Sequence, residues 1–479
     1  MIRAPYLFAG ALVAGLAAST AVRFSSAAAV LLVLPALVRM RVAVVCLLLL
    51  GGWWWGSARI DVLDHSVLVA SVGTAGRAVV TVAEPPKRGR WDVHVRAVVL
   101  RWRGSQVHEP ALLQLPGTRA PPQGARLTVL GILRAPPDYE RVWLRRHGVH
   151  VVLRASRWRV LRVRGGVADR LHGWLARAST PGLTGERRAV LEGVVLGEDG
   201  GLSESLRQRF RASGLYHLLA VSGGNVLVVA GGAAGLAILL GIGRLAAEAI
   251  ALAAIGAYVL AVGPQPSVIR AGIAGALLSL AWLTGRQRDR WYALLVAAVV
   301  LLAWNPWNVL DPGFQLSFAA VVSIFVLVPR FKRVLEGYPM PAWVRDCISI
   351  SAACGLCTAP ISWLHFHAIP VLTVPANAAA APAMPPMLAL ALLAAILPPA
   401  GPLLAQLSGL LAAYLACCAR FFGGLPGAQA RSPAAVAALG SGVLLAAAYA
   451  WRRGERVEAG LSAARQRPSE DRPRRASSP

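Results

Sequence analysis

Residues 214–229 read GLYHLLAVSGGNVLVV, and this stretch marks the point where the chain changes from a mixed polar sequence to a long hydrophobic one. Three polar side chains, those of His217, Ser222 and Asn225, interrupt the apolar run. Hydrocarbon cannot satisfy hydrogen-bonding groups, so polar residues persist at such a place only where they face protein, water or a substrate. The patch is therefore the first candidate functional site.

The composition is that of an integral membrane protein. Of 479 residues, 56% are hydrophobic and 15% are charged, and the mean hydropathy is +0.56. Apolar runs of about 20 residues, the length that crosses a bilayer, recur through the C-terminal half. The 49 basic and 22 acidic residues give a net charge of +27, which suits an anionic partner such as lipid headgroups or nucleic acid.

Two kinds of catalytic machinery are excluded. Both lysines, Lys87 and Lys332, lie outside any G-x-x-x-x-G-K-[ST] loop, which excludes a Walker-type ATPase. His365 and His367 form an H-x-H, but the Asp-His pair that a binuclear metallohydrolase needs does not follow. We therefore predict no metal, no cofactor and no enzymatic activity.

The N-terminal residues 1–56 predict three short membrane spans, the last two at 27–38 and 42–55. Arg39 and Arg41 lie in the turn between these two spans, so the positive-inside rule predicts a cytoplasmic turn and a cytoplasmic N-terminus. Three tryptophans at 53–55 mark the exit of the chain on the outer side, since indoles prefer the headgroup layer.

Residues 57–165 predict a small extracytoplasmic β-domain. The period of the apolar residues changes to two, most clearly in WDVHVRAVVLR at 91–101. DYERVWLRRHG at 138–148 predicts one helix within the domain. Stretches of the same strand character, separated by breaks rich in Pro and Gly, lie at 77–83, 125–133 and 150–155.

This pattern fits a small β-barrel or sandwich with a strongly basic surface. Between Ser57 and Arg177, 21 basic minus 8 acidic residues give a net charge of +13. Tryptophans interleaved with these cations suit single-stranded nucleic acid, because bases stack on aromatic rings at about 1–3 kcal/mol each. The alternative is a solvated basic face over core tryptophans, and composition by itself favours it.

Residues 166–213 predict charged amphipathic helices along the membrane surface, and residues 214–451 predict the main transmembrane domain. The fold class is thus a polytopic α-helical membrane protein of about 10–12 spans with a small β-domain. Alternate connections carry the arginines, which places the C-terminus in the cytoplasm. The spans are predicted at 225–242, 246–262, 267–284, 291–304, 313–328, 346–363, 371–397, 402–422 and 434–451.

Two segments of this region stand apart. Four prolines interrupt 371–397, so this segment is either one span or two half-helices, which occur where backbone lines a cavity. Residues 452–479 are charged, rich in Pro and Ser, and without period, which predicts a disordered cytoplasmic tail.

Further polar side chains fall at or inside the predicted spans. An arginine at a helix centre costs about 2.5–3.5 kcal/mol on insertion scales, although Arg270 lies one turn from a span end and could snorkel. Asp311 precedes a proline, which predicts a helix N-cap. Gln315, Ser317 and Asn377 have no such structural explanation.

Four stretches together resemble the ComEC-type competence channels, which carry single-stranded DNA across the bacterial inner membrane. Family members also carry an OB-like domain between early membrane helices, and APPDYERVWLRRHGV at 135–149 resembles its closing segment. In the family's order and spacing, the four stretches are RFRASGLYHLLAVSGGNV (209–226), PSVIRAGIAG (266–275), NPWNVLDPGFQLSFAAVVSI (305–324) and APISWLHFHAIPVLTVPANAAAAP (359–382).

The resemblance implies an OB-like barrel that receives single-stranded DNA and a wet, positively biased path across the membrane. It reverses the preference for a merely solvated basic face. The DNA-binding residues that it suggests are Trp91, Arg96, Arg101, Trp102 and Arg103. The pathway-lining residues that it suggests are His217, Ser222, Gly223, Asn225, Arg270, Asp311, Gln315, Ser317 and Asn377.

Two departures from the family accompany the resemblance. The family pattern SGLHV reads SGGNV here, so Gly224 and Asn225 replace a leucine and a histidine, and protonation at that position is not expected to be essential. Many members end in a metallo-β-lactamase-like domain, before which this chain stops, so a nuclease is expected to be a separate polypeptide.

The implied location is the bacterial inner membrane, with both termini cytoplasmic. The implied partners are single-stranded DNA, the lipid bilayer, a separate DNA receptor, and a cytoplasmic motor or strand-binding protein. Two alternatives stay open. A secondary transporter of a small anionic solute would also use a broken helix and an intramembrane arginine, and a degenerate homologue could keep the fold without transport.

Overall fold

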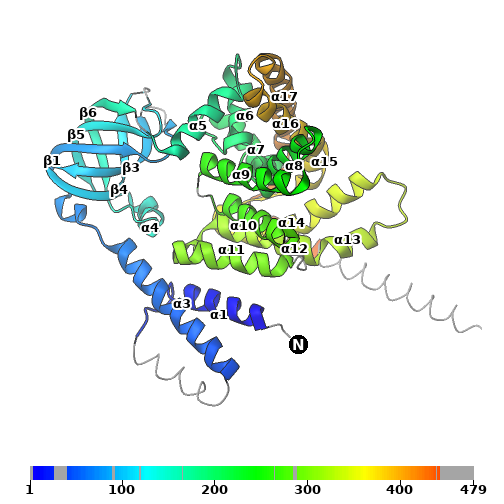
Figure 1. Cartoon of the computed structure of the whole chain (residues 1–479), viewed down its shortest axis with the longest axis horizontal. Helices are drawn as coiled ribbons and strands as arrows, with labels where there is room; N and C mark the ends of the chain where they lie inside the picture. The colour runs from blue at the N-terminus through cyan, green and yellow to red at the C-terminus, as the bar shows by residue number, and fades with distance from the viewer. Residues whose placement is uncertain are drawn as a thin grey trace, which may run out of the picture.

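The structure is a computed structural model, and it describes residues 4–25, 40–88, 92–117, 120–163, 165–263, 265–283, 289–438 and 440–442. A sheet domain lies beyond one end of a bundle of helices, and helix α13 lies at the opposite end (Figure 1). The architecture is therefore mainly helical, with the β-domain outside the helical part.

The N-terminal part is a closely packed pair of helices, α1 (Ala4–Ala18) and α3 (Met40–Asp64). Glycines meet where the helices cross. A Cβ built on Gly15 would lie 2.0 Å from the carbonyl oxygen of Leu49, and one built on Gly52 would lie 2.7 Å from that of Leu12. Small residues let two membrane helices approach this closely.

Helix α3 is longer than the span predicted at 42–55, because it continues past the three tryptophans to Asp64. The first strand accordingly begins at Ala75, well beyond the predicted domain boundary at residue 57. The boundary was misplaced because polar residues such as Asp61 lower the hydropathy without ending the helix. The predicted span at 27–38 lies outside the described residues.

The β-domain is a single sheet in the order β1-β5-β6-β4-β3-β2, and β1 also pairs with β3. The hydrogen-bonded pairing thus runs from β1 through β5, β6, β4 and β3 and back to β1. Strands β4 and β6 are parallel, and the other pairings are antiparallel. The elements are η2 (Leu68–Ser71), β1 (Ala75–Val82), β2 (Lys87–Arg88), β3 (Asp92–Trp102), β4 (Ser105–Pro116), β5 (Ala125–Arg134), α4 (Asp138–Arg146) and β6 (Val152–Val163).

The strands predicted at 77–83, 91–101, 125–133 and 150–155 and the helix predicted at 138–148 are confirmed. Alternating burial explains this success, since every second residue of β3 from Val93 to Val99 is buried in the domain core. Strand β4 was missed. Only its second half faces the core, and Pro110, which usually argues against a strand, lies in its middle.

Three helices connect the β-domain to the membrane region: α5 (Val167–Ala178), α6 (Gly185–Leu196) and α7 (Glu204–Ser213). All three were predicted as helices at the membrane surface. For α6 this placement is wrong, because Ala189 to Leu191 and Gly193 to Leu196 are buried in the largest hydrophobic core, with α16 and α17. Two arginines and two glutamates in α6 had suggested a surface helix, but they occupy its first two turns and one outer edge.

The membrane region forms helices at each predicted span up to residue 424. Six described helices are long and apolar enough to cross a membrane, or seven if the bent pair α12 and α13 is one span. This supports a multi-pass membrane protein. This number is smaller than the predicted 10–12 spans for two reasons. Helices α1, α10 and α11 are too short to be counted as spans by length, and most of 434–451 lies outside the described residues.

Segment 371–397 forms one apolar candidate span of 24 residues whose α-helical turns are interrupted by a 3₁₀ turn at its prolines. The elements of the membrane region are η3 (Tyr216–Leu218), α8 (Gly223–Leu239), α9 (Arg244–Val262), α10 (Pro266–Leu283), α11 (Arg290–Trp304), η4 (Pro306–Leu310), α12 (Pro312–Val326), α13 (Val328–Val334), α14 (Ala342–Phe366), β7 (Ile369–Pro370), α15 (Thr373–Ala380), η5 (Ala381–Ala383), α16 (Met384–Ile396), α17 (Gly401–Gly424) and β8 (Gln429–Ala430).

Candidate functional site

The stretch 214–229 folds as a turn followed by the start of helix α8. Gly214 has φ of +77°, a conformation that glycine adopts without strain, and it ends α7. The side chain of His217 is exposed, and its Nδ1 lies 2.8 Å from the carbonyl oxygen of Gly214. Ser222 then occupies the N-cap position of α8.

Asn225 does not line an open path. It is 4% exposed, and its Nδ2 donates to the carbonyl oxygen of Val194 at 2.8 Å. The Tyr258 hydroxyl donates to the next carbonyl, that of Val195, at 2.8 Å. The last four carbonyls of a helix have no partner within it, so Asn225 and Tyr258 complete the buried C-terminal end of α6. The prediction of a pathway role for Asn225 is therefore replaced by a structural role.

Removing this bond should destabilise the fold. We expect Asn225→Ala to lower the free energy of unfolding by about 1–3 kcal/mol, because the Val194 carbonyl would stay buried without a partner. Thermal or denaturant unfolding of the purified full chain measures the change. Ser222→Ala is the matched control, since the Ser222 hydroxyl donates to Asn225 Oδ1 at 3.0 Å and leaves the bond to Val194 intact. Equal stability of Asn225→Ala and wild type would contradict the capping role.

Arg270 points from α10 toward α12. Its Nε donates to the Ser317 hydroxyl at 2.8 Å, and it forms no ion pair with any residue in the described part of the chain. One guanidinium nitrogen lies 3.7 Å from where a Cβ of Gly223 would be, at the start of α8. The Arg270 side chain therefore does not snorkel to the membrane surface, because it contacts residues of neighbouring helices.

Gln315 extends the polar contacts from α12 to α14. Its Nε2 donates to the carbonyl oxygen of Val309 at 2.9 Å, and its Oε1 lies 2.8 Å from Nε2 of His365. His365 was considered from the sequence only as a metal ligand, so its pairing with Gln315 was missed. The hydrogen bonds join α10, α12 and α14, and Arg270 also lies beside Gly223 of α8. We name this set the polar relay: Gly223, Arg270, Ser317, Gln315 and His365.

The other two candidates lie outside this set. The Asp311 carboxylate accepts from the backbone N–H of Phe314 at 3.1 Å, which confirms the predicted N-cap of α12. Asn377 is half-buried on α15, and no side-chain hydrogen bond of it is recorded to the described residues. No group of three metal-ligating side chains occurs among the residues that were described.

The β-domain residues that were predicted to bind DNA lie in different environments. Trp102 is 4% exposed in the domain core, so the prediction that bases stack on it is wrong. A β-bulge between Val99 and Arg101 shifts the alternation by one residue and turns Trp102 inward. Arg96 is held by Glu84 at 2.8 Å, and Trp91 lies outside the described residues. Arg101 and Arg103 are exposed at the β3–β4 hairpin.

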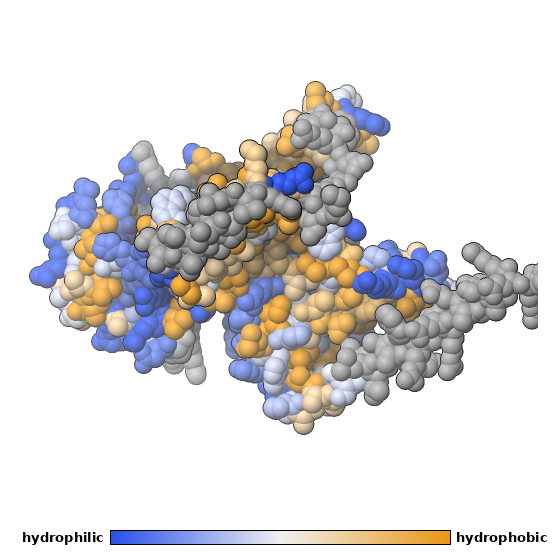
Figure 2. Space-filling model, turned by 90° about the horizontal axis from the view of Figure 1, so that it is seen from below, coloured by the Kyte–Doolittle hydropathy of each residue, from blue (hydrophilic) through white to orange (hydrophobic). Residues whose placement is uncertain are grey.

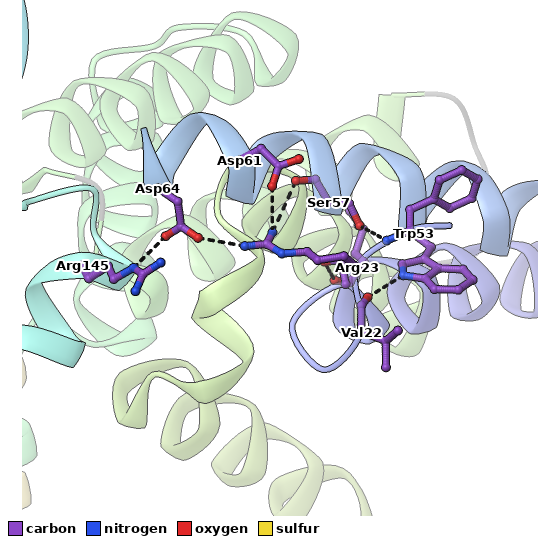
Figure 3. Close-up of polar contacts among 10 residues, drawn as sticks. Val22, Arg23, Trp53, Ser57, Asp61, Asp64 and Arg145 are labelled. Carbon is purple, nitrogen blue, oxygen red and sulfur yellow. Dashed lines mark hydrogen bonds and ion pairs between the residues drawn. The ribbon is translucent and has the colours of Figure 1, made fainter. Parts of the chain in front are cut away.

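Asp64 joins the β-domain to the N-terminal helix pair. Its carboxylate accepts from Arg23 at 2.8 Å and from Arg145 of α4 at 3.1 Å, and Arg23 also faces Asp61 (Figure 3). The Asn305 side chain makes a second junction, donating to the carbonyl oxygen of Arg146 at 2.9 Å. The β-domain is thus anchored next to the N-terminal end of α12, where the residues of the polar relay on that helix begin.

His172 forms a third junction, between α5, the loop after α6 and the end of α9. It is 8% exposed, its Nδ1 donates to the carbonyl oxygen of Ala261 at 2.8 Å, and its Nε2 lies 2.7 Å from Oε1 of Glu198. Burial alone lowers the pKa of His172, but Glu198, the Ala261 carbonyl and nearby Asp169 outweigh burial and raise the pKa above 6.5. Both ring nitrogens face acceptors, so the imidazolium satisfies both contacts.

This junction predicts a pH dependence of stability. A raised folded-state pKa contributes stability that is fully present below the unfolded pKa and is lost as pH rises through the folded value. We expect the unfolding temperature of the purified full chain to fall as pH rises above about 6.5, and His172→Gln to remove this component. His108→Gln, at an exposed histidine, is the control. An unaltered pH profile in His172→Gln would rule the junction out as its source.

Comparison with known proteins shows the family. The sequence model of the competence protein family matches residues 194–455. ComE operon protein 3 of Bacillus subtilis (strain 168) is 29% identical over 189 residues, which cover 39% of this chain and 24% of that protein. The uncharacterized protein YcaI of Escherichia coli (strain K12) is 27% identical over 216 residues, which cover 40% of this chain and 27% of that protein.

The chain therefore spans about a quarter of the length of these relatives. No solved structure matches it. The family match covers more than half of the chain and contains every residue of the polar relay. The resemblance predicted from the four sequence stretches is confirmed. This chain belongs to the competence protein family.

Proposed function

We propose that this protein is a channel of the bacterial inner membrane that takes up single-stranded DNA in natural transformation, without catalysing a reaction. The observation that carries the proposal is the polar relay, in which hydrogen bonds from Arg270 to Ser317 and between Gln315 and His365 link the three membrane helices α10, α12 and α14. Intramembrane polar groups are expensive and mark substrate pathways. Family membership and the similarity to ComE operon protein 3 support DNA as the substrate.

The chemistry of the relay suits a phosphate-bearing strand. The Arg270 guanidinium lies beside the first turn of α8, whose N-terminal end carries a partial positive charge. Gly223 and Gly224 leave that turn without side chains, so a phosphate oxygen could approach the backbone N–H groups closely. Ser317, Gln315, His365 and the exposed His217 would supply hydrogen bonds to a strand that has shed part of its water.

We also propose that the β-domain is an OB-like barrel that receives the strand outside the membrane. The ring of strand pairings through β1, with β4 and β6 parallel, supports this assignment. The β-domain and α13 lie at opposite ends of the helices, and α13 carries Lys332 and Arg333 (Figure 1). The positive-inside rule then favours a cytoplasmic α13, an outer β-domain and cytoplasmic termini.

Other components would complete the process. A separate receptor would deliver DNA, a cytoplasmic motor or strand-binding protein would pull the strand inward, and a separate nuclease would degrade the other strand. A secondary transporter of a small anion is the second candidate, favoured by the interrupted helix at 373–396.

The experiment that separates the two candidates uses the full chain in sealed proteoliposomes loaded with a strand-binding protein. Protected, labelled oligonucleotide inside the vesicles is the result expected for the channel. Accumulation of a small anion such as phosphate, with no oligonucleotide inside, would favour the transporter. Exclusion of both solutes would favour a non-transporting homologue.

A further inference from the structure

One face of the β-domain is lined by arginines that form no recorded ion pair with any described residue. The charged residues of β1, β5 and β6 are all arginines. These three strands are adjacent in the sheet. We name the following set of outward-facing residues the arginine face: Arg77, Arg126, Arg154, Arg157, Arg159 and Arg162.

The strand register arranges these side chains in rows. Arg77 of β1 is paired with Leu130, which is paired with Arg157 of β6. In the rows on either side, Thr128 is paired with Arg159 and Ile132 is paired with Arg154. The row beyond Thr128 pairs Arg126 with Arg162. Successive rows on one face are about 6.7 Å apart, since the rise is about 3.3 Å per residue. A hydrogen-bonded sheet thus presents cations at regular intervals.

The arginine face is electrostatically uncompensated. Within the described ranges, no ion pair and no side-chain hydrogen bond is recorded for any of its six members. The neighbouring strands differ, because Arg96 of β3 is paired with Glu84 and because Asp92 and Glu109 lie on β3 and β4. Unpaired guanidinium groups bind phosphate oxygens bidentately and also stack on bases.

Exposed apolar side chains lie between the arginines. Leu130 is 47% exposed and Ile132 is 40% exposed. Figure 2 shows the same mixture over the sheet domain, whose surface is mostly hydrophilic with hydrophobic residues among the polar ones. Such a surface offers contacts to phosphates and to the apolar faces of sugars and bases together, which fits a single strand better than a duplex.

The position of the domain favours nucleic acid over lipid headgroups. Strands β1 and β5 lie on the side of the β-domain away from the helices, whereas β4 lies beside α4 (Figure 1). The membrane surrounds the helices, so the part of the arginine face on β1 and β5 meets the aqueous phase. Cations that bound headgroups would lie near the helix ends.

We propose that the arginine face is the docking surface on which single-stranded DNA binds before it reaches the polar relay. The proposal rests on the proposed function and assigns DNA binding to β1, β5 and β6 in place of β3.

The test measures binding of a fluorescent oligothymidylate to the full chain in nanodiscs of zwitterionic lipid, by anisotropy over a range of salt concentrations. Arg126→Gln/Arg157→Gln/Arg162→Gln is expected to weaken binding by tenfold or more. It should also reduce the slope of log K against log salt by about 2, since each phosphate contact in a single strand contributes about 0.7. The corresponding triple lysine variant should keep the slope.

The matched control is Lys87→Gln/Arg141→Gln/Arg177→Gln, which removes the same charge from exposed positions outside the arginine face. It should bind like wild type. Equal weakening in both triple variants would show a general charge effect and overturn the proposal. Anionic nanodiscs test the lipid alternative. If they lower the affinity of wild type for the oligonucleotide but not that of the arginine-face variant, lipid headgroups occupy the arginine face. If the wild-type protein does not bind the oligonucleotide, the proposal that the β-domain receives DNA is rejected. If the arginine-face variant binds as tightly as wild type, only the assignment of this surface is rejected.

Discussion

Arg270→Met is expected to lower uptake of single-stranded DNA by on the order of 100-fold, with the protein at its normal level in the membrane. Within the polar relay, Arg270 supplies the one full positive charge. It has no carboxylate partner among the described residues. A guanidinium about 4 Å from a phosphate contributes about 4 kcal/mol at an effective dielectric of about 20, and water in the path screens part of this. About 1.4 kcal/mol corresponds to a factor of ten in rate.

Uptake of labelled DNA by transformable cells, with immunoblotting for the full chain, measures this effect. Arg333→Met is the matched control, because it removes the same charge from an exposed position on α13 at the other end of the helices. Arg270→Lys should retain part of the activity, and Ser317→Ala should lose less than Arg270→Met, since it removes the hydrogen-bond partner but not the charge. Normal uptake by Arg270→Met would remove Arg270 from the path.

Gly15→Leu is expected to have the largest effect on stability, about 3 kcal/mol or more. Its Cβ alone would lie 2.0 Å from the Leu49 carbonyl oxygen, so α1 and α3 would have to separate. Overpacking usually costs about 1–3 kcal/mol where side chains can shift. Here the obstacle is backbone, and the contact of Arg23, which follows α1, with Asp64 of α3 would also be lost.

Gly10→Leu is the matched control on the same helix, because no atom of the described residues lies within 4 Å of a Cβ built there. Unfolding of the purified full chain gives the difference in free energy, and a cysteine pair placed across the two helices reports their separation by its crosslinking yield. Similar stability of the two leucine variants would mean that the close crossing at Gly15 does not hold the helix pair together.

Local patterns predicted most elements of the fold. Alternation in WDVHVRAVVLR specified β3, and aspartate followed by proline specified the cap of α12 at Asp311. Both signals depend on neighbours within a few residues, so they can be read without the rest of the chain. The four family stretches likewise predicted the membership that the comparison confirmed.

The candidate site was predicted only in part. Gln315 and Ser317 were recognised as polar side chains without a local explanation, and the structure joins Ser317 of α12 to Arg270 of α10. His365, the partner of Gln315, was missed, because the sequence does not show that position 365 lies beside position 315. Asn225 was misread for the same reason, since its partner Val194 is on α6.

By itself, the sequence determined a membrane protein with a basic β-domain, because composition and periodicity directly reflect the solvent that each segment meets. Only the tertiary structure decided that Trp102 faces inward, that α6 is buried and that the unpaired arginines gather on β1, β5 and β6. A bulge, a helix crossing and a strand pairing each join residues distant in the chain. Which polar group finds a partner depends on those contacts and not on its neighbours in sequence.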